Sequence, residues 1–212
     1  VSVSRRQIIG LEALLRWNHP TRGTLTPNGF IEIAEELGLI SEISRWVLEE
    51  ACAQLAKWRT NGHMDVRMSV TMSALDFDRS DIVPSITECL QRHALPPARM
   101  ELEITESLMM NNAAGVKLKV EELRGAGISI AIDDFGTGYS ALAYLQQFPV
   151  STLKIDRGFV RDLDGPKSNP IISAITGIAR GFDLDVVAEG VEQLHQVETL
   201  QLLGCDIMQG YY

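Results

Sequence analysis

GISIAIDDFGTG, residues 127–138, joins a short apolar run to two adjacent aspartates and a glycine-rich turn. A run this short, rich in β-branched residues and bounded by glycine, is typical of a buried strand. Asp133 and Asp134 repel each other unless a cation lies between them. Gly136 and Gly138 permit a tight loop directly after the acids. The stretch therefore predicts a buried strand that ends at a cation-binding site.

Six further apolar runs alternate with stretches of helical period. We expect strands at 7–17, 65–73, 99–107, 151–157, 183–190 and 205–211, and helices at 42–59, 80–93, 112–125, 170–181 and 192–203. Ser41 is expected to cap the first of these helices. The alternation predicts βαβ units and a largely parallel α/β sheet. A (β/α)8 barrel short of one strand is preferred over an open doubly wound sheet, because no G-x-G-x-x-G follows an early strand. The pattern alone leaves both architectures open.

Composition narrows the class of protein. The 212 residues suit one domain, and the net charge of −9 without a basic run argues against binding a DNA or RNA polymer. The three cysteines are scattered, which is typical of reduced thiols rather than of disulfides or a zinc site. No run is long enough to span a membrane and no signal peptide is evident. We expect a single domain over 1–212, cytoplasmic, cut from a longer protein that could itself be membrane-anchored.

Charged or amide side chains fall near the C-terminal ends of separate strands. They are Glu12, Glu103, Asp133, Asp134 and Glu189, with Lys154 and Gln209. A single acid at a strand end is most simply a surface residue, but placing charge on so many core strands is costly unless the charges are paired. In a parallel barrel those ends converge on one face. One lysine cannot neutralise five carboxylates, and an all-oxygen ligand set favours one or two Mg²⁺ or Mn²⁺ ions over Zn²⁺. Ca²⁺ would bind the same oxygens and is expected to inhibit.

Six segments, in order, resemble the EAL domain family, the bacterial phosphodiesterases and receptors of cyclic di-GMP. They are GLEALLRW (10–17), ELEITES (101–107), IDDFGTGYSAL (132–142), LKIDRGFV (153–160), VVAEGVE (186–192) and GCDIMQGY (204–211). The resemblance spans essentially the whole chain. It implies a modified, TIM-like (β/α)8 barrel that hydrolyses cyclic di-GMP to linear pGpG with Mg²⁺ or Mn²⁺. The family's leading strand is absent, which fits a missing or clipped first strand.

The resemblance also implies a role for each matching residue. The implied catalytic residues are Lys154, Glu189 and Asp134, and the implied metal ligands are Glu12, Thr71, Glu103, Asp133, Asp134 and Glu189. The implied substrate contacts are Leu14, Arg16 and Gln209. The loop and the site would be supported by Glu106, Gly136, Gly138 and Glu192. The implied partners are cyclic di-GMP, a second copy of the chain in a homodimer through the segment near 140–147, and a regulatory sensor or GGDEF-type domain.

Thr71 departs from the family pattern, which has asparagine at this place. A threonine hydroxyl is a weaker ligand for a hard cation than an amide oxygen, and it sits on a shorter side chain. Two hypotheses follow: a phosphodiesterase whose activity is intact or weakened, and a degenerate EAL domain that binds cyclic di-GMP without cutting it. Because the other matching residues are present, we favour hydrolysis.

Overall fold

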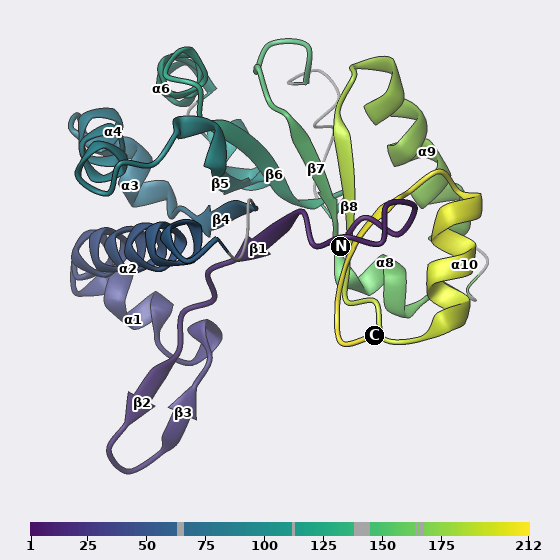
Figure 1. Cartoon of the computed structure of the whole chain (residues 1–212), viewed down its shortest axis with the longest axis horizontal. Helices are drawn as coiled ribbons and strands as arrows, with labels where there is room; N and C mark the ends of the chain where they lie inside the picture. The colour runs from purple at the N-terminus through teal and green to yellow at the C-terminus, as the bar shows by residue number, and fades with distance from the viewer. Residues whose placement is uncertain (63–65, 112, 138–144, 164, 166–167) are drawn as a thin grey trace.

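The structure is a computed structural model, and it describes residues 1–62, 66–111, 113–137, 145–163, 165 and 168–212. Seven parallel strands form one curled sheet (Figure 1). In sheet order they are β1 (Gly10–Glu12), β4 (Arg67–Thr71), β5 (Met100–Thr105), β6 (Ser129–Phe135), β7 (Thr152–Ile155), β8 (Asp185–Glu189) and β9 (Ile207–Gln209). Each lies within a predicted strand, so the seven strand predictions are confirmed. The architecture is a modified (β/α)8 barrel, as predicted.

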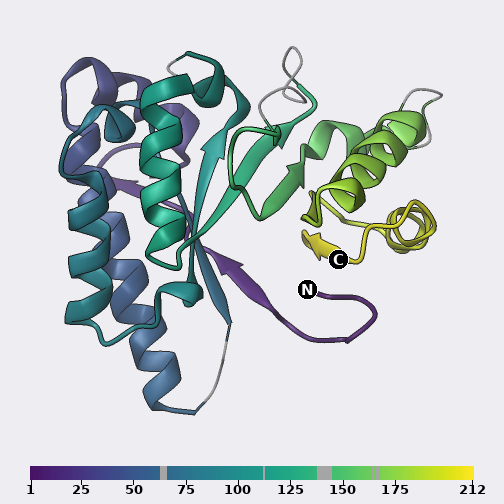
Figure 2. The ribbon, with the colours of Figure 1, turned by 90° about the horizontal axis from the view of Figure 1, so that it is seen from above.

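Helices cover the outside of this sheet (Figures 1 and 2). They are α1 (Ile31–Glu36), α2 (Ile40–Thr60), α3 (Ala74–Asp78), α4 (Ile82–Arg92), α5 (Glu106–Asn111), α6 (Ala113–Gly125), α8 (Arg157–Arg161), α9 (Ser168–Gly181) and α10 (Leu194–Leu202), with short 3-10 turns at Pro27–Gly29 and Pro97–Arg99. The five predicted helices correspond to α2, α4, α6, α9 and α10. The cap at Ser41 is wrong: Gly38, at φ +70°, turns the chain directly from α1 into α2, which begins at Ile40.

Alternating side chains on the central strands separate the core from the barrel interior. Leu102, Ile104, Ile130, Ile132, Leu153 and Ile155 are fully buried among the helices. Burying one such side chain contributes about 1.5–3 kcal/mol, so this layer dominates the stability of the sheet. Glu101, Glu103 and Lys154 take the alternate positions and are also buried. Charge therefore lies inside the barrel, where it needs partners.

Besides α1, two features of the first part of the chain were not predicted. An antiparallel hairpin of β2 (Trp17–His19) and β3 (Gly23–Leu25) projects from the body between β1 and α1 (Figure 1). Residues 1–3 run antiparallel beside β9, where the Met208 amide donates to the Val1 carbonyl oxygen over 2.9 Å. Among the described residues, no helix is long and apolar enough to cross a membrane.

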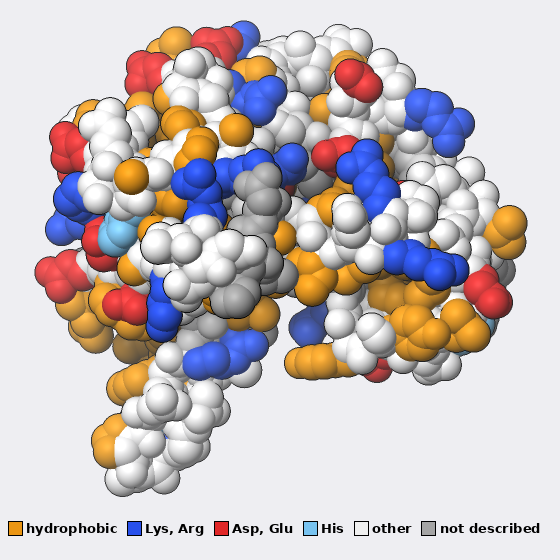
Figure 3. Space-filling model, in the orientation of Figure 1, with side chains coloured by type: hydrophobic (Ala, Val, Ile, Leu, Met, Phe, Trp, Pro, Cys, Tyr) orange, Lys and Arg blue, Asp and Glu red, His pale blue; other side chains and the backbone are white. Residues whose placement is uncertain are grey.

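A cavity of about 1130 Å³ lies inside the curled sheet, between its two edge strands β1 and β9. In Figure 3 the surface is notched on this side, between the hairpin and the C-terminal segment. The cavity lining includes Glu12, Leu14, Glu103, Lys154 and Gln209. The interior of the barrel thus opens to solvent beside the predicted acids.

Candidate active site

Lys154 lies at the centre of four carboxylates from four different strands. Its Nζ is 2.6 Å from Glu189 Oε1, 2.7 Å from Glu103 Oε2, 3.2 Å from Asp133 Oδ1 and 3.6 Å from Glu12 Oε2. The strands are β7 for the lysine and β1, β5, β6 and β8 for the acids. Their ends converge because the sheet is parallel and curled. The structure thus brings together the acids that the sequence analysis placed in one pocket.

Neighbouring polar groups hold two of these acids in place. Gln209, at the end of β9, donates from Nε2 to Glu12 Oε2 over 2.6 Å. Thr71, at the end of β4, donates from Oγ1 to Glu103 Oε2 over 3.4 Å. Gln209 therefore orients a carboxylate in this structure, whereas the threonine hydroxyl lies at the limit of a hydrogen bond.

Asp133 and Asp134 lie on a β-bulge. Between the register pairs Ile132–Leu153 and Phe135–Ile155, the two aspartates of β6 oppose Lys154 alone on β7. Asp134 has φ +53°, a left-handed conformation that aspartate tolerates better than most residues. An extra residue of this kind re-aims side chains that would otherwise point to opposite faces. This explains how adjacent aspartates serve one site.

Ligand oxygens of Asp133, Asp134 and Glu189 all lie within 4.8 Å of one another. Counting Glu12 and Glu103, five carboxylates and one lysine leave four negative charges when all are ionised. The donors are oxygens only, which suits a hard divalent cation. The residues therefore fit Mg²⁺ or Mn²⁺.

The pKa values reflect this excess of negative charge. Burial raises the pKa of Glu103 to about 8; Lys154 lowers it, and Glu12 and Asp133 raise it further. Burial likewise raises the pKa of Glu189 to about 7, with Lys154 opposing. Burial disfavours the charged form of Lys154, but the surrounding carboxylates together raise its pKa above the ordinary value. Lys154 is thus a fixed cation, and a further positive charge would be needed to ionise the acids fully.

The loop after the aspartates is anchored from α5. Glu106 is buried and accepts a hydrogen bond from the Gly136 amide over 3.2 Å. Gly136 has φ +97°, and a Cβ there would lie 3.2 Å from Phe159 and 3.3 Å from Ile175. Gly138 lies outside the described residues. Gly136 and the Glu106 carboxylate therefore fix where the loop leaves the bulge.

Three further predicted residues, Leu14, Arg16 and Glu192, are exposed. Leu14 is exposed and lines the cavity. Arg16 is exposed and donates from Nη1 to the Leu15 carbonyl oxygen over 2.7 Å. Glu192 is exposed, and its backbone amide donates to Gln196 Oε1 over 2.8 Å. Among the described residues, none of the hydrogen bonds and ion pairs given for the carboxylates around Lys154 involves these three side chains.

Asp156 was missed as a site residue. It follows β7 directly, accepts a hydrogen bond from the Gly158 amide over 2.9 Å, and caps α8. Burial, then the negative charges of Asp133 and Asp156, raise the pKa of Asp134. The signal was present in the sequence, because Asp156 is one more acid at a strand end.

The comparisons with known proteins decide the family. The family model of the EAL domain matches residues 1–212. This chain belongs to the EAL domain family. It is 47% identical over 205 residues to MucR of Pseudomonas aeruginosa, a bifunctional diguanylate cyclase/cyclic di-GMP phosphodiesterase, and 41% identical over 202 residues to NbdA of the same organism, a cyclic di-GMP phosphodiesterase. Those matches cover 96% and 95% of this chain but only 30% and 26% of the relatives.

Solved EAL structures share the fold closely. The MucR phosphodiesterase in complex with c-di-GMP superposes with a TM-score of 0.93 at 47% identity, covering 97% of this chain and 83% of that one. The EAL domain of FimX from Pseudomonas aeruginosa, bound to c-di-GMP, gives a TM-score of 0.88 at 25% identity, covering 96% of this chain and 81% of that one. This EAL domain therefore shares its whole fold with proteins seen with c-di-GMP bound.

Proposed function

We propose that this EAL domain is a metal-dependent phosphodiesterase that hydrolyses cyclic di-GMP to linear pGpG. The observation that carries the proposal is the cluster of Glu12, Glu103, Asp133 and Glu189 around Lys154 at one end of the parallel strands. The names of the relatives, MucR and NbdA, support the substrate and the reaction.

The carboxylates would hold the cation. Asp133, Asp134 and Glu189 offer oxygens close enough to share one ion. Glu12, Glu103 and Thr71 extend the donor set toward β1, β5 and β4. Bound Mg²⁺ or Mn²⁺ would supply Lewis-acid activation of water and of the phosphodiester.

The chain's own groups would handle charge and protons. Lys154 keeps its proton, so it acts as a positive charge beside the phosphate and not as a base. Burial raises the pKa of Glu189 to about 7 in the metal-free protein, and a bound cation would lower it; we propose Glu189 as the carboxylate that takes up a proton. Gln209 keeps Glu12 oriented. Leu14 lines the open cavity, where the dinucleotide would enter, and Arg16 is exposed two residues further along the chain.

A receptor that binds cyclic di-GMP without cutting it is the second candidate, and Thr71 is the observation that favours it. The hydroxyl is exposed and makes a weak 3.4 Å hydrogen bond to Glu103. An asparagine amide oxygen would reach further and bind a hard cation better. A weakened ligand lowers metal affinity, and turnover falls with it.

The domain would work within a longer signalling protein. The chain spans about a third or less of its curated relatives, and the name of MucR includes a diguanylate cyclase. We therefore propose a sensor or GGDEF-type domain in the same protein, with the EAL domain on the cytoplasmic side. We also propose a homodimer; most of the segment near 140–147 that would carry it lies outside the described residues.

Hydrolysis is tested by incubating the protein with cyclic di-GMP and Mg²⁺ or Mn²⁺ and separating the products by chromatography. We expect pGpG to form, and a chelator to stop it. Glu12→Gln keeps the side-chain volume but removes a carboxylate, and should lower the rate by about 100-fold or more. Glu50→Gln, the same change at an exposed position on α2, should leave the rate unchanged. Full activity in chelator, or in Glu12→Gln, would contradict the proposal.

Thr71→Asn separates the two candidates. If the native protein turns over and the variant changes the rate by less than about tenfold, the phosphodiesterase stands. If the native protein binds cyclic di-GMP in a calorimeter with saturating Mn²⁺ but yields no pGpG, and the variant does yield it, the domain is a receptor.

A further inference from the structure

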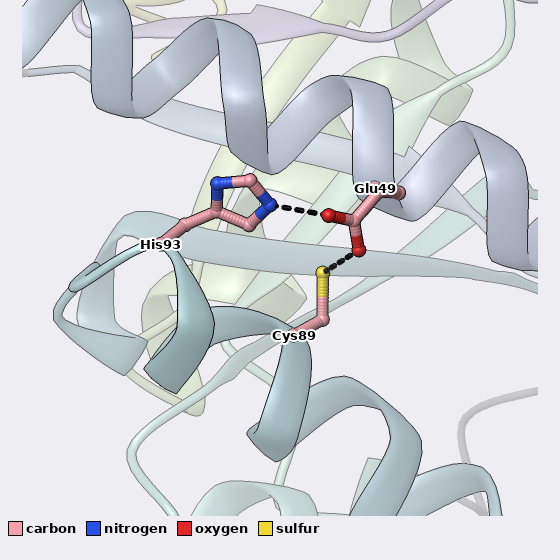
Figure 4. Close-up of side chains that lie close together, drawn as sticks. All are labelled: Glu49, Cys89 and His93. Atoms are coloured by element: carbon pink, nitrogen blue, oxygen red, sulfur yellow. Dashed lines mark hydrogen bonds and ion pairs between the residues drawn. The ribbon is translucent and has the colours of Figure 1, made fainter.

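A second group of metal-binding side chains lies between two helices on the outside of the barrel. Glu49 projects from α2, and Cys89 and His93 project from α4 and its C-terminal cap (Figure 4). One ligand atom of each lies within 4.8 Å of the other two. The carboxylates around Lys154 come from the strand ends inside the sheet, so the two groups share no residue.

Helix geometry explains why these side chains meet. Cys89 and His93 are four residues apart, so they lie on the same face of the helix. That face packs on α2, where the Cys89 thiol donates to Glu49 Oε2 over 3.3 Å. The other carboxylate oxygen, Oε1, lies 2.6 Å from His93 Nε2. The carboxylate is thus held between the thiol and the imidazole (Figure 4).

The group is open to solvent on one side. The Glu49 and His93 side chains are 44% and 20% exposed, whereas Cys89 is buried. An ion could therefore enter from solvent, and water could complete its coordination. A second thiol, Cys52, follows Glu49 by about one helical turn on α2 and is fully buried.

An ordinary ion pair between helices is the simpler explanation for part of this group. Arg92 Nη2 lies 2.6 Å from Glu49 Oε2, and its side chain is 57% exposed. A carboxylate bridged by arginine and histidine needs no thiol, yet Cys89 occupies the third position around Glu49. Because Arg92 is on the solvent side, an ion can replace it at the carboxylate without moving either helix.

We propose that Glu49, Cys89 and His93 form a second metal site, which binds Zn²⁺ or a similar transition-metal ion and joins α2 to α4. Sulfur, imidazole nitrogen and carboxylate oxygen are the ligands that Zn²⁺ prefers, and Mg²⁺ does not bind such a set well. Three protein ligands with water in the fourth position give a common tetrahedral site. Binding displaces the proton of the thiol and any proton on His93.

Cobalt is the probe that distinguishes this site from the all-oxygen one. Reduced, chelator-treated protein is titrated with Co²⁺ and its absorption is recorded. A cysteine ligand gives a thiolate-to-cobalt charge-transfer band in the near ultraviolet, which oxygen ligands cannot give. With the carboxylate site filled by excess Mg²⁺, we expect the band to appear, to saturate at one equivalent of Co²⁺ and to disappear when Zn²⁺ is added.

Variants assign the band to these residues. Cys89→Ser should remove it, and His93→Gln, at a partly exposed position, should weaken Co²⁺ binding by roughly tenfold or more. Cys205→Ser, at a buried thiol beside β9, and Glu12→Gln, at the other metal site, should leave the band unchanged. The proposal would be overturned if the native protein gave no band, or if the band survived in Cys89→Ser. It would also be overturned if His93→Gln bound Co²⁺ with the native affinity.

Discussion

Lys154 has an environment that few lysines in folded proteins have. It is buried, and its ammonium group faces four carboxylates within 3.6 Å. A buried charge of this kind persists only when it is paired, and here one ammonium group faces more carboxylates than it can neutralise. The excess carboxylate charge can be neutralised by protons or by a divalent cation.

Replacing Lys154 tests its part in the reaction. Lys154→Met keeps the length of the side chain but removes the charge beside the phosphate. We expect kcat to fall by about 10²–10³-fold, the usual cost of losing one group that stabilises developing negative charge. Lys117→Met, at a partly exposed lysine of α6 paired with Glu121, should keep the native kcat. A variant at Lys154 with native kcat would remove this residue from the mechanism.

The pKa values of Glu103 and Glu189 predict how metal binding depends on pH. Both are raised, to about 8 and about 7, so the metal-free protein still holds protons there at neutral pH. A cation must displace those protons, so its affinity should rise as the pH increases from 6 to 8. Titration calorimetry in buffers of different ionisation heat should detect proton release on Mg²⁺ binding. An affinity that is constant over this range would contradict the raised pKa values.

Much of the site could be predicted at the level of single residues. Acids at strand ends are visible in the sequence, and a parallel sheet brings them together. The β-bulge and the positive φ of Asp134 were not visible, because they depend on pairing with β7. Asp156 was overlooked although it is one more acid at a strand end; its capping of α8 is a local contact with the Gly158 amide. The roles of the individual residues stay predictions.

At the scale of elements, the loop that follows β6 depends on one glycine. Gly136→Ala would place a Cβ against Phe159 and Ile175 in a left-handed conformation. We expect a loss of about 1–3 kcal/mol in the free energy of unfolding, measured by denaturant titration. Gly177→Ala is the matched control: it lies inside α9, where a Cβ meets nothing within 4 Å, and should stabilise the protein by about 0.5–1 kcal/mol. Equal effects of the two changes would contradict this account of the loop.

The repeated βα pattern made most of the strands and long helices predictable from the sequence. The elements that depart from this pattern were not predicted. Seven strands and five long helices follow from short apolar runs and helical stripes. The β2–β3 hairpin and α1 were not predicted, because their strands and helix are three to six residues long and carry little periodicity. The antiparallel course of residues 1–3 depends on contacts with β9, more than 200 residues away.

At the scale of the whole molecule, the cation should stabilise the fold. An ion that binds only the folded state at 100 times its dissociation constant contributes about 2.7 kcal/mol. For a domain of this size, that corresponds to a rise in Tm of roughly 5–10 °C. We expect this rise in Tm with Mg²⁺, which should not bind the group of Glu49, Cys89 and His93. We expect Asp133→Asn to abolish most of the rise. A calorimetric Tm that rises equally in both proteins would place the bound ion elsewhere.

The central claim is that carboxylates at the ends of separate parallel strands hold a divalent cation. The most direct measurement is the anomalous scattering of Mn²⁺ in crystals of the protein grown with cyclic di-GMP. We predict an anomalous peak within bonding distance of oxygens of Asp133, Asp134 and Glu189. Ordered Mn²⁺ elsewhere, with no peak at these three carboxylates, would contradict the account.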